Sequence, residues 1–375
     1  MHEPLAISLK RVRGSLPQEA PGARGLERLA RNPACLRLGV LTLAGVSPAT
    51  VAREAYGKPA KEGQSPFAIG IGNQFESTLF KDGAQRFLDL YRTAGRLGPS
   101  ETYVVNISEL VPGTGQEVMS QRMTQTLRLL GFRRSDQSKA PHIIIKPRLT
   151  LPLAGIARGI EPDVLVAATS DSFYRPVEIK SYPDRDGKTS PSDLRSALRQ
   201  AAVGVLALRH ALTDRLNMPA HEAADRVPDW GDIVLRKPGS MRGSLRPMSL
   251  AGEVDSIARS LVSAKADVAI AIAHLPTDAS LADPTVLDAI PNHFRESCKE
   301  HCALAKQCKA AAILAGDPAI LGDIARETLH APQTLGRVID LLHGRGFAPI
   351  TPAEEAVRSD LQRAHSAYRE AVGHE

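Results

Sequence analysis

The sequence predicts an α/β protein in which a central sheet is followed by a helical C-terminal subdomain. Runs rich in β-branched residues, such as "TYVVNIS", "HIIIKPRLT" and "GDIVLR", mark a strand-rich centre. The segments before and after this centre show helical spacing instead. This order of elements is typical of a sheet covered by helices. At 375 residues and 43% hydrophobic content, the chain is long enough to bury a sizeable core.

The first part of the chain is expected to be helical. Residues 1–22 are basic and contain Pro and Gly, which predicts a flexible N-terminal arm. A helix is expected over residues 23–32. In residues 72–95, Phe75, Leu79 and Phe87 recur at near-helical spacing, which predicts an amphipathic helix.

The centre is expected to hold most of the strands. Strands are predicted over 102–108 and 142–150, and the stretch 161–182 reads as two strands joined by a polar turn. A helix should begin near Ser190 and Pro191, followed by a strand over 231–236. We therefore expect a core domain over 23–250 and a helical region over 251–375.

The charge of the chain is modest overall but uneven. The net charge is +6, from 47 basic and 41 acidic residues. Between residues 121 and 158 the basic side chains outnumber the acidic ones eight to one. This stretch and the basic hairpin or loop "RKPGSMRGSLR" are candidate DNA-contacting surfaces, or simply solvated basic faces. The eight basic residues of the stretch are Arg122, Arg128, Arg133, Arg134, Lys139, Lys146, Arg148 and Arg158.

No segment of the sequence indicates export or a membrane partner. The N-terminal "MHEPLAISLKRVRG" lacks the apolar run of a signal peptide, and no stretch approaches the roughly 20 apolar residues of a membrane span. We therefore expect a cytoplasmic protein whose four cysteines do not form a disulfide framework. Trp230, the one tryptophan, is expected in the core.

Two carboxylates and a lysine stand out in the stretch 161–182. Asp163 opens the first strand, and Glu178 and Lys180 lie two residues apart on the second, so they share one face. If the strands pair as a hairpin, Asp163 lies near Glu178, and a cation between the two carboxylates would relieve their repulsion. Mg²⁺ or Mn²⁺ would suit these oxygen ligands. The alternative is a Glu–Lys ion pair on a half-exposed strand beside an unrelated Asp.

Pro162-Asp163 followed by Glu178-x-Lys180 resembles the signature of the PD-(D/E)XK nuclease superfamily. The resemblance implies a restriction-endonuclease-like fold, with a mixed central sheet flanked by helices, and makes 23–250 the nuclease core. It also implies that Asp163 and Glu178 bind the metal and that Lys180 assists the attacking water.

Two further positions are similar to the RecB-like branch of this superfamily. Gln200 matches the glutamine of its Q-x-x-x-Y motif, whereas Gly204 stands at the place of the tyrosine. Glu76 in "GNQFE" matches a first motif that carries a further metal ligand. The alternatives are an exposed helical Glu76 and a solvated Gln200.

Three of the four cysteines are clustered. Cys298, Cys302 and Cys308 lie within eleven residues, and Cys35 lies far upstream. Four thiolates suit an iron–sulfur cluster or a structural zinc ion, for which His293 or His301 could replace one thiolate.

The arrangement of one distant cysteine and a C-terminal trio resembles that of RecB-like iron–sulfur nucleases. This group includes the CRISPR-associated exonucleases and the AddB nuclease domain. The resemblance implies a structural [4Fe–4S] cluster held by Cys35, Cys298, Cys302 and Cys308, and Zn²⁺ remains the alternative.

The sequence as a whole predicts a metal-dependent deoxyribonuclease that acts on single- or double-stranded DNA in repair, recombination or defence against foreign DNA. No P-loop is present, so a helicase, ATPase or defence-system partner would be a separate protein. The alternatives are a non-cleaving nucleic-acid-binding module with a nuclease-like fold and a zinc-stapled structural protein.

Overall fold

The computed structural model describes residues 3–19, 21–58, 66–98, 102–135, 137–167, 173–329, 331–345 and 351–373. It divides into two compact units, Met1–Ser47 with Gln64–Leu287 and Pro48–Gly63 with Asp288–Glu375. The boundary between the expected core domain and the helical region, at residue 250, falls inside the first unit.

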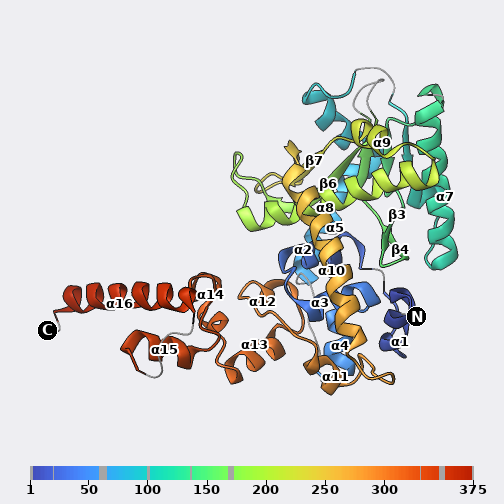
Figure 1. Cartoon of the computed structure of the whole chain (residues 1–375). Coiled ribbons are helices and arrows are strands. Elements are labelled where there is room, and N and C mark those ends of the chain that lie inside the picture. The colour runs from blue at the N-terminus through green and yellow to red at the C-terminus, as the bar shows by residue number, and fades with distance from the viewer. Residues whose placement is uncertain are drawn as a thin grey trace. The chain divides into compact units, whose positions relative to one another are not determined.

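The first unit is built on a mixed six-stranded sheet with the order β1-β2-β5-β6-β7-β8 (Figure 1). The pairs β1–β2 and β6–β7 are parallel and the other three pairs are antiparallel. This sheet and its helices confirm the predicted α/β class. Its strands are β1 (Val104–Asn106), β2 (Ile143–Ile145), β5 (Val164–Val166), β6 (Arg175–Pro183), β7 (Trp230–Arg236) and β8 (Gly243–Ser249).

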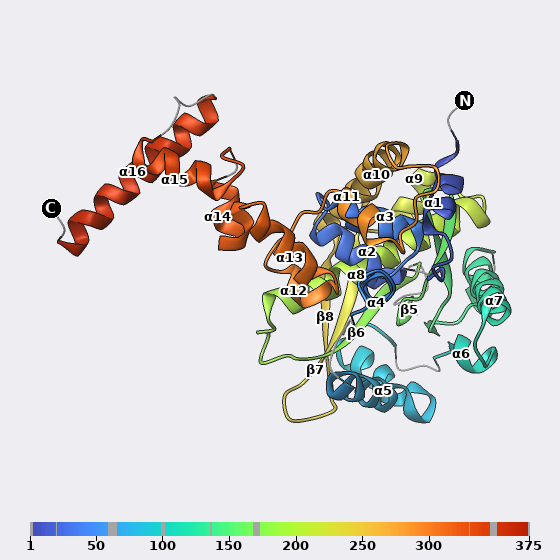
Figure 2. The same ribbon diagram turned by 90° about the horizontal axis from the view of Figure 1, so that it is seen from below.

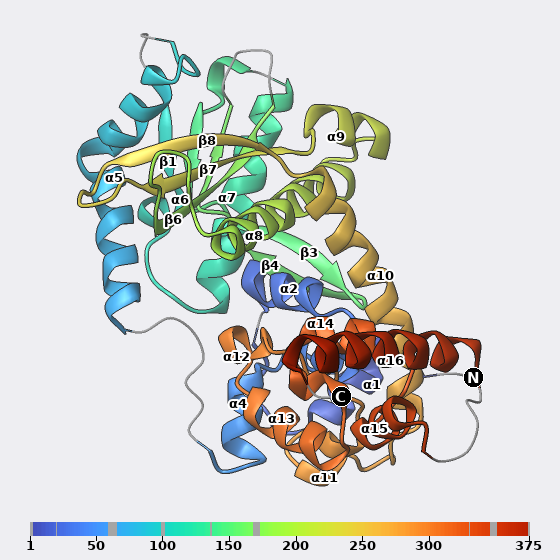
Figure 3. The same cartoon turned by 90° about the vertical axis from the view of Figure 1, so that its left-hand side faces the viewer.

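The helices α5 (Pro66–Thr93) and α8 (Pro191–His210) cover opposite faces of this sheet, as Figure 2 shows. A separate ribbon of two strands, β3 (Leu149–Leu153) and β4 (Ile156–Ile160), lies beside α8 (Figure 3). The other helical elements that lie wholly in this unit are α1 (Leu5–Arg13), α2 (Gly22–Arg31), α3 (Leu36–Ala44), α6 (Ile107–Leu110), α7 (Gln116–Ser135), η1 (Gln137–Lys139), η2 (Ala211–Arg215), α9 (Ala220–Arg226) and α10 (Ala251–Ala273).

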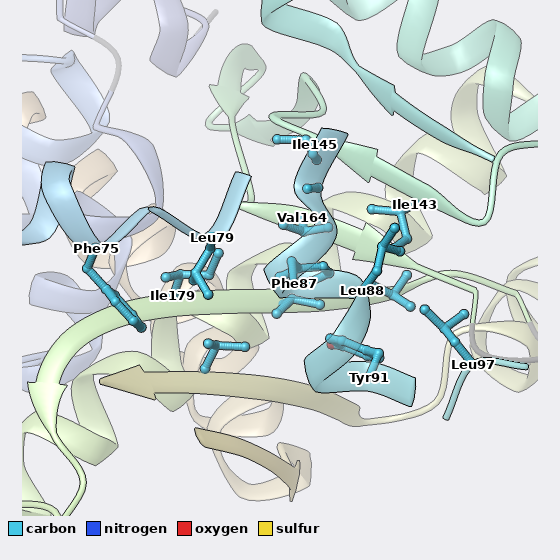
Figure 4. Close-up of a cluster of buried hydrophobic side chains, with 14 residues drawn as sticks. Phe75, Leu79, Phe87, Leu88, Tyr91, Leu97, Ile143, Ile145, Val164 and Ile179 are labelled. Atoms are coloured by element: carbon cyan, nitrogen blue, oxygen red, sulfur yellow. The ribbon is translucent and has the colours of Figure 1, made fainter. Parts of the chain in front are cut away.

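The core under α5 follows the predicted helical spacing. Phe75, Leu79 and Phe87 are buried and pack with Val177 and Ile179 of β6 (Figure 4). The helix is not continuous, because residues 81–84 have non-helical backbone angles. The kink separates Phe75 and Leu79 from Phe87, yet the hydrophobic side chains of both halves join one cluster.

A second layer of helices lies over α8. Helix α10 packs against α2, α3 and α8, which explains why residues 251–273 belong to the first unit. The N-terminal arm expected over 1–22 also differs from the structure. Residues Leu5–Arg13 form α1, and Leu9 and Val12 are fully buried because α1 packs against α3 and α10.

The second unit is helical in its described parts, as predicted for the C-terminal region. Leu329, Val338, Leu341 and Val357 form a small hydrophobic cluster within it. Helix α11 (Pro284–Ala289) spans the boundary between the units. The helical elements of this unit are α4 (Pro48–Glu54), α12 (Cys298–His301), α13 (Ala305–Leu314), η3 (Pro318–Leu321), α14 (Asp323–Thr328), α15 (Leu335–His343) and α16 (Pro352–Val372).

Within the described ranges, no helix combines the length and the apolar character that crossing a bilayer needs.

A buried arginine makes one glycine of the first unit sensitive to substitution. Gly45 has φ +72°, and a Cβ there would lie 2.6 Å from a guanidinium nitrogen of Arg158. Arg158 is 2% exposed and donates to the carbonyl of Leu43 over 2.8 Å, so it cannot withdraw without losing that bond. We expect Gly45→Ala to lower the free energy of unfolding by about 2–4 kcal/mol, because the contact adds to the left-handed backbone cost.

Chemical denaturation measures this difference, and Gly95→Ala is the matched control. Gly95 has φ +67°, but a Cβ there would meet nothing within 4 Å. It should cost only the backbone term of about 1–2 kcal/mol. Equal losses in both variants would contradict a role for the Arg158 contact.

Candidate functional site

Asp163 and Glu178 are brought together by the pairing of β5 with β6. The two strands are antiparallel, and Val164 lies opposite Val177, so Asp163 precedes β5 at the level of Glu178. Asp163 Oδ2 accepts a hydrogen bond from the backbone amide of Ile179 over 2.8 Å. The antiparallel pairing predicted from the sequence is therefore present, whereas the expected polar turn at 168–172 lies outside the described residues.

Glu178 and Lys180 share the face of β6 that is covered by α8. Lys180 Nζ lies 2.5 Å from Glu178 Oε1 and donates to Gln200 Oε1 over 3.1 Å. Gln200 in turn donates through Nε2 to Ser196 Oγ, 3.3 Å away on the previous turn of α8. Glu178, Lys180 and Gln200, three of the residues singled out in the sequence, thus form one connected network.

Burial dominates the electrostatics of Glu178. The residue is 6% exposed, and loss of hydration raises the pKa of its carboxyl group to about 7, with Asp163 adding repulsion and Lys180 opposing both. Burial alone would lower the pKa of Lys180, but Glu178 and Asp163 outweigh it and raise that pKa. The two side chains therefore form an ion pair only when Glu178 is ionised.

A second lysine, Lys146, completes the site and was not predicted as a member of it. Its Nζ lies 2.7 Å from Glu76 Oε1 and 2.9 Å from Asp163 Oδ1. These carboxylates raise the pKa of Lys146 against the lowering effect of burial. No local sequence pattern marks Lys146, because its place beside Asp163 depends on the position of β2 next to β5 in the sheet.

Glu76 reaches the same place from α5. The residue follows the buried Phe75 and is half-buried, with its side chain 31% exposed. It joins Asp163 through the ammonium group of Lys146, so all the polar residues expected at the site, Glu76 included, belong to one constellation.

A pocket of about 320 Å³ opens beside this constellation. A larger pocket of about 390 Å³ lies in the second unit, but its arginines are already paired, Arg295 with Asp323 and Arg326 with Asp317. We therefore regard the smaller pocket as the candidate site. The polar residues that line it include Arg24, Asn73, Glu76, Asp163, Lys180 and Ser181.

The carboxylates of Glu76, Asp163 and Glu178 are of the donor type that Mg²⁺ and Mn²⁺ prefer. In the part of the chain that the structure describes, no group of three or more His, Cys, Asp or Glu side chains is arranged to hold a metal ion. Glu76 and Asp163 instead contact the Lys146 ammonium. The donor set fits a divalent cation chemically, and Lys146 lies between two of its members.

Close packing explains why a glycine stands at position 204. A Cβ added to Gly204 would lie 3.0 Å from Cβ of Pro176 and 3.5 Å from Pro162. Helix α8 thus approaches β6 so closely that a tyrosine ring would not fit at this point. The departure from the Q-x-x-x-Y motif has a steric reason in this chain.

The four cysteines belong to different units. Cys35 lies at the N-cap position of α3 in the first unit. In the second, Cys298 begins α12, Cys302 follows it with a hydrogen bond back to the Cys298 carbonyl, and Cys308 lies on α13. None of the four forms a disulfide bond, and their sulfur atoms are of the soft donor type that iron and zinc accept.

The prediction that the basic residues of 121–158 form a DNA-contacting or solvated surface is wrong for several of them. Arg133 and Arg158 are 2% exposed, and Arg122 donates to the carbonyls of Val111 and Gly113. Lys146 lies in the carboxylate site. Arg158 donates to the Leu43 carbonyl and Arg133 lies over the ring of Tyr174, so neither side chain faces solvent.

Trp230 is also placed differently from the prediction. It begins β7 and is 44% exposed, so it does not belong to the core. As the first residue of β7, it pairs with Ser249 of β8, which is also exposed.

Comparison with known proteins adds no neighbour. No protein-family model, curated protein or solved structure matches the chain. An interpretation of the site therefore depends on its own residues and geometry.

The buried carboxyl group of Glu178 predicts a pH-dependent loss of stability. Its folded-state pKa, about 7, lies above the ordinary value of 4.5 for a glutamate. Protonation therefore stabilises the folded state, and this contribution is present below about pH 4.5 and lost as the pH rises through about 7. Relative to wild type, Glu178→Gln should gain a few degrees in melting temperature between pH 5 and pH 8.

Thermal melts followed by circular dichroism in EDTA measure this gain. Glu161→Gln is the control, because Glu161 lies near the same strands but its side chain is 31% exposed and lies 3.9 Å from Arg148. A constant difference between Glu178→Gln and wild type at both pH values would contradict the burial effect.

Proposed function

We propose that this chain is a metal-dependent deoxyribonuclease of the PD-(D/E)XK, RecB-like type that hydrolyses phosphodiester bonds of DNA. One observation carries the proposal. Asp163, Glu178 and Lys180 converge from two paired strands beside a pocket, and Gln200 contacts the lysine from the neighbouring helix. The nuclease-like identity of the fold is part of the same proposal.

In this proposal Glu76, Asp163 and Glu178 hold Mg²⁺ or Mn²⁺. When bound, the cation supplies positive charge against the negative charge that develops on the phosphate. Asp163 is oriented for this role by the Ile179 amide, which occupies its Oδ2. Glu178 is oriented by Lys180.

Lys180 positions the attacking water by donating a hydrogen bond to it. The side chain is held by Glu178 on one side and by Gln200 on the other, so its Nζ has little freedom to turn away. Gln200 is a positioning residue, since it acts through the lysine. Fixing the nucleophile in this way lowers the entropy cost of reaching the transition state.

The setting of the reaction follows from the same interpretation. We propose that the enzyme acts in the cytoplasm, in repair, recombination or defence, on single- or double-stranded DNA. A separate helicase, ATPase or defence-system protein would supply strand separation, because the sequence has no P-loop.

Cys35, Cys298, Cys302 and Cys308 are proposed to hold a structural [4Fe–4S] cluster. Four thiolates are the usual ligand set of such a cluster. Support comes from the clustering of three cysteines on α12, α13 and the turn between them. Zn²⁺ is the alternative occupant of the same thiolates.

A second candidate function is a nucleic-acid-binding module that does not cleave. The contact of Lys146 with both Glu76 and Asp163 favours it, because an ammonium group already neutralises these carboxylates. The two functions differ in whether DNA is cut when a divalent cation is supplied.

Lys180→Ala should separate cleavage from binding. Loss of the positioned water should reduce DNA cleavage in Mn²⁺ by about 100-fold or more, while binding measured in Ca²⁺ stays within about twofold of wild type. Cleavage is followed on end-labelled linear and on circular DNA, both single- and double-stranded.

Lys188→Ala is the matched control, since Lys188 is exposed and lies outside the pocket lining. It should cut like wild type. Binding without any cleavage by the wild-type protein would support the non-cleaving module instead.

The cysteine proposal predicts a brown protein when the chain is purified without oxygen. Elemental analysis should find about four iron and four sulfide per chain, because all four thiolates are needed for a complete cluster. Cys308→Ser should lose most of the iron and the visible colour.

Lys309→Ser, next to that cysteine, is the control and should retain the iron. A colourless wild-type protein containing about one zinc per chain would support the zinc alternative. A protein free of both metals would contradict both assignments.

A further inference from the structure

The Lys146 ammonium occupies the space between two of the three proposed metal ligands. Its Nζ lies within hydrogen-bonding distance of Glu76 and Asp163, at 2.7 and 2.9 Å. The side chain is 22% exposed, so most of it is removed from solvent. A positive charge is therefore already present where the two carboxylates meet.

The backbone of Lys146 is fixed against Asp163. Its amide donates to the Asp163 carbonyl over 2.9 Å, directly after the paired residues Ile145 and Val164. The residue has φ +51°, a left-handed conformation that is unfavourable for a side chain with a Cβ. The strand pairing thus holds the chain in the place from which Lys146 reaches both carboxylates.

The charges of the site show what this arrangement does. Glu76, Asp163 and Glu178 supply three negative charges when ionised, and Lys146, Lys180 and Arg24 of the pocket wall supply three positive charges, so the sum is 0. Without Lys146 the sum would be −1. Lys146 relieves the repulsion between the carboxylates of Glu76 and Asp163. Without its positive charge, these carboxylates would attract a divalent cation more strongly.

We propose that Lys146 is a built-in counter-ion that a divalent cation must displace from Glu76 and Asp163, so that this lysine sets the metal affinity of the site. The inference rests on the proposed function, because it takes these carboxylates as metal ligands. A cation can reach these carboxylates to displace Lys146, because Glu76 and Asp163 line the pocket of about 320 Å³. The four-carbon stem of lysine lets the ammonium leave without movement of its backbone.

Titration of Mn²⁺ into the full-length protein without DNA tests this inference. Lys146→Met removes the charge and keeps the length of the stem, so it should bind Mn²⁺ at least about tenfold more tightly than wild type. Lys146→Arg keeps the charge and should stay within about threefold of wild type. Lys188→Met makes the same chemical change at an exposed lysine and should leave the affinity unchanged.

Thermal melts provide a second readout that also reports folding. In EDTA, Lys146→Met should melt below wild type because its carboxylates repel, and Mn²⁺ should raise its melting temperature more than that of wild type. A Lys146→Met protein that melts cooperatively but binds Mn²⁺ with wild-type affinity overturns the inference. Failure of every variant to bind Mn²⁺ overturns it together with the metal site.

The outcome is separable from that of the nuclease proposal. Tighter Mn²⁺ binding by Lys146→Met in a protein that never cuts DNA would support the counter-ion and contradict the nuclease. A different result would contradict the counter-ion alone. In that result, the wild-type protein cuts DNA, Lys180→Ala does not, and Lys146→Met binds Mn²⁺ with the affinity of wild type.

Discussion

The site depends on the antiparallel pairing of β5 with β6. This pairing brings Asp163 to the level of Glu178, and the hydrogen bond from the Ile179 amide to Asp163 Oδ2 fixes the carboxylate across the two strands. A shift of one residue in register would turn Glu178 and Lys180 toward α5 and expose Ile179 on the polar side. The hydrophobic cluster that contains Val177 and Ile179 resists that shift, so the core under α5 maintains the chemistry on the other face.

The alternation along β6 therefore links stability to function. Val177 and Ile179 pack under α5, whereas Glu178 and Lys180 face α8, where Gln200 receives the lysine. The close approach of α8 to β6 at Gly204 brings the side chain of Gln200 within hydrogen-bonding distance of Lys180. A bulky side chain at position 204 would push the helix away from β6.

The sequence predicted the parts of this arrangement that local periodicity encodes. The strands follow from their runs of β-branched residues, although the single strand predicted over 142–150 is divided into β2 and β3, which lie in different sheets. The shared face of Glu178 and Lys180 follows from the alternation of side chains, and α8 follows from its Ser190-Pro191 start. Lys146 could not be found in this way, because its contacts arise from the order of β2 beside β5 and from a left-handed residue. The kink in α5 and the burial of α1 and Arg158 also depend on tertiary packing, which periodicity does not report.

The two lysines of the site are held differently, and this difference assigns them different roles. Lys180 contacts one carboxylate and the neutral amide of Gln200, so it keeps a partner even when Glu178 binds something else. The ammonium of Lys146 contacts Glu76 and Asp163 alone among the described residues, and both are candidate metal ligands. On the proposed function, a divalent cation that engages those carboxylates would take both partners of Lys146, whereas Lys180 would keep the neutral amide of Gln200 as its partner.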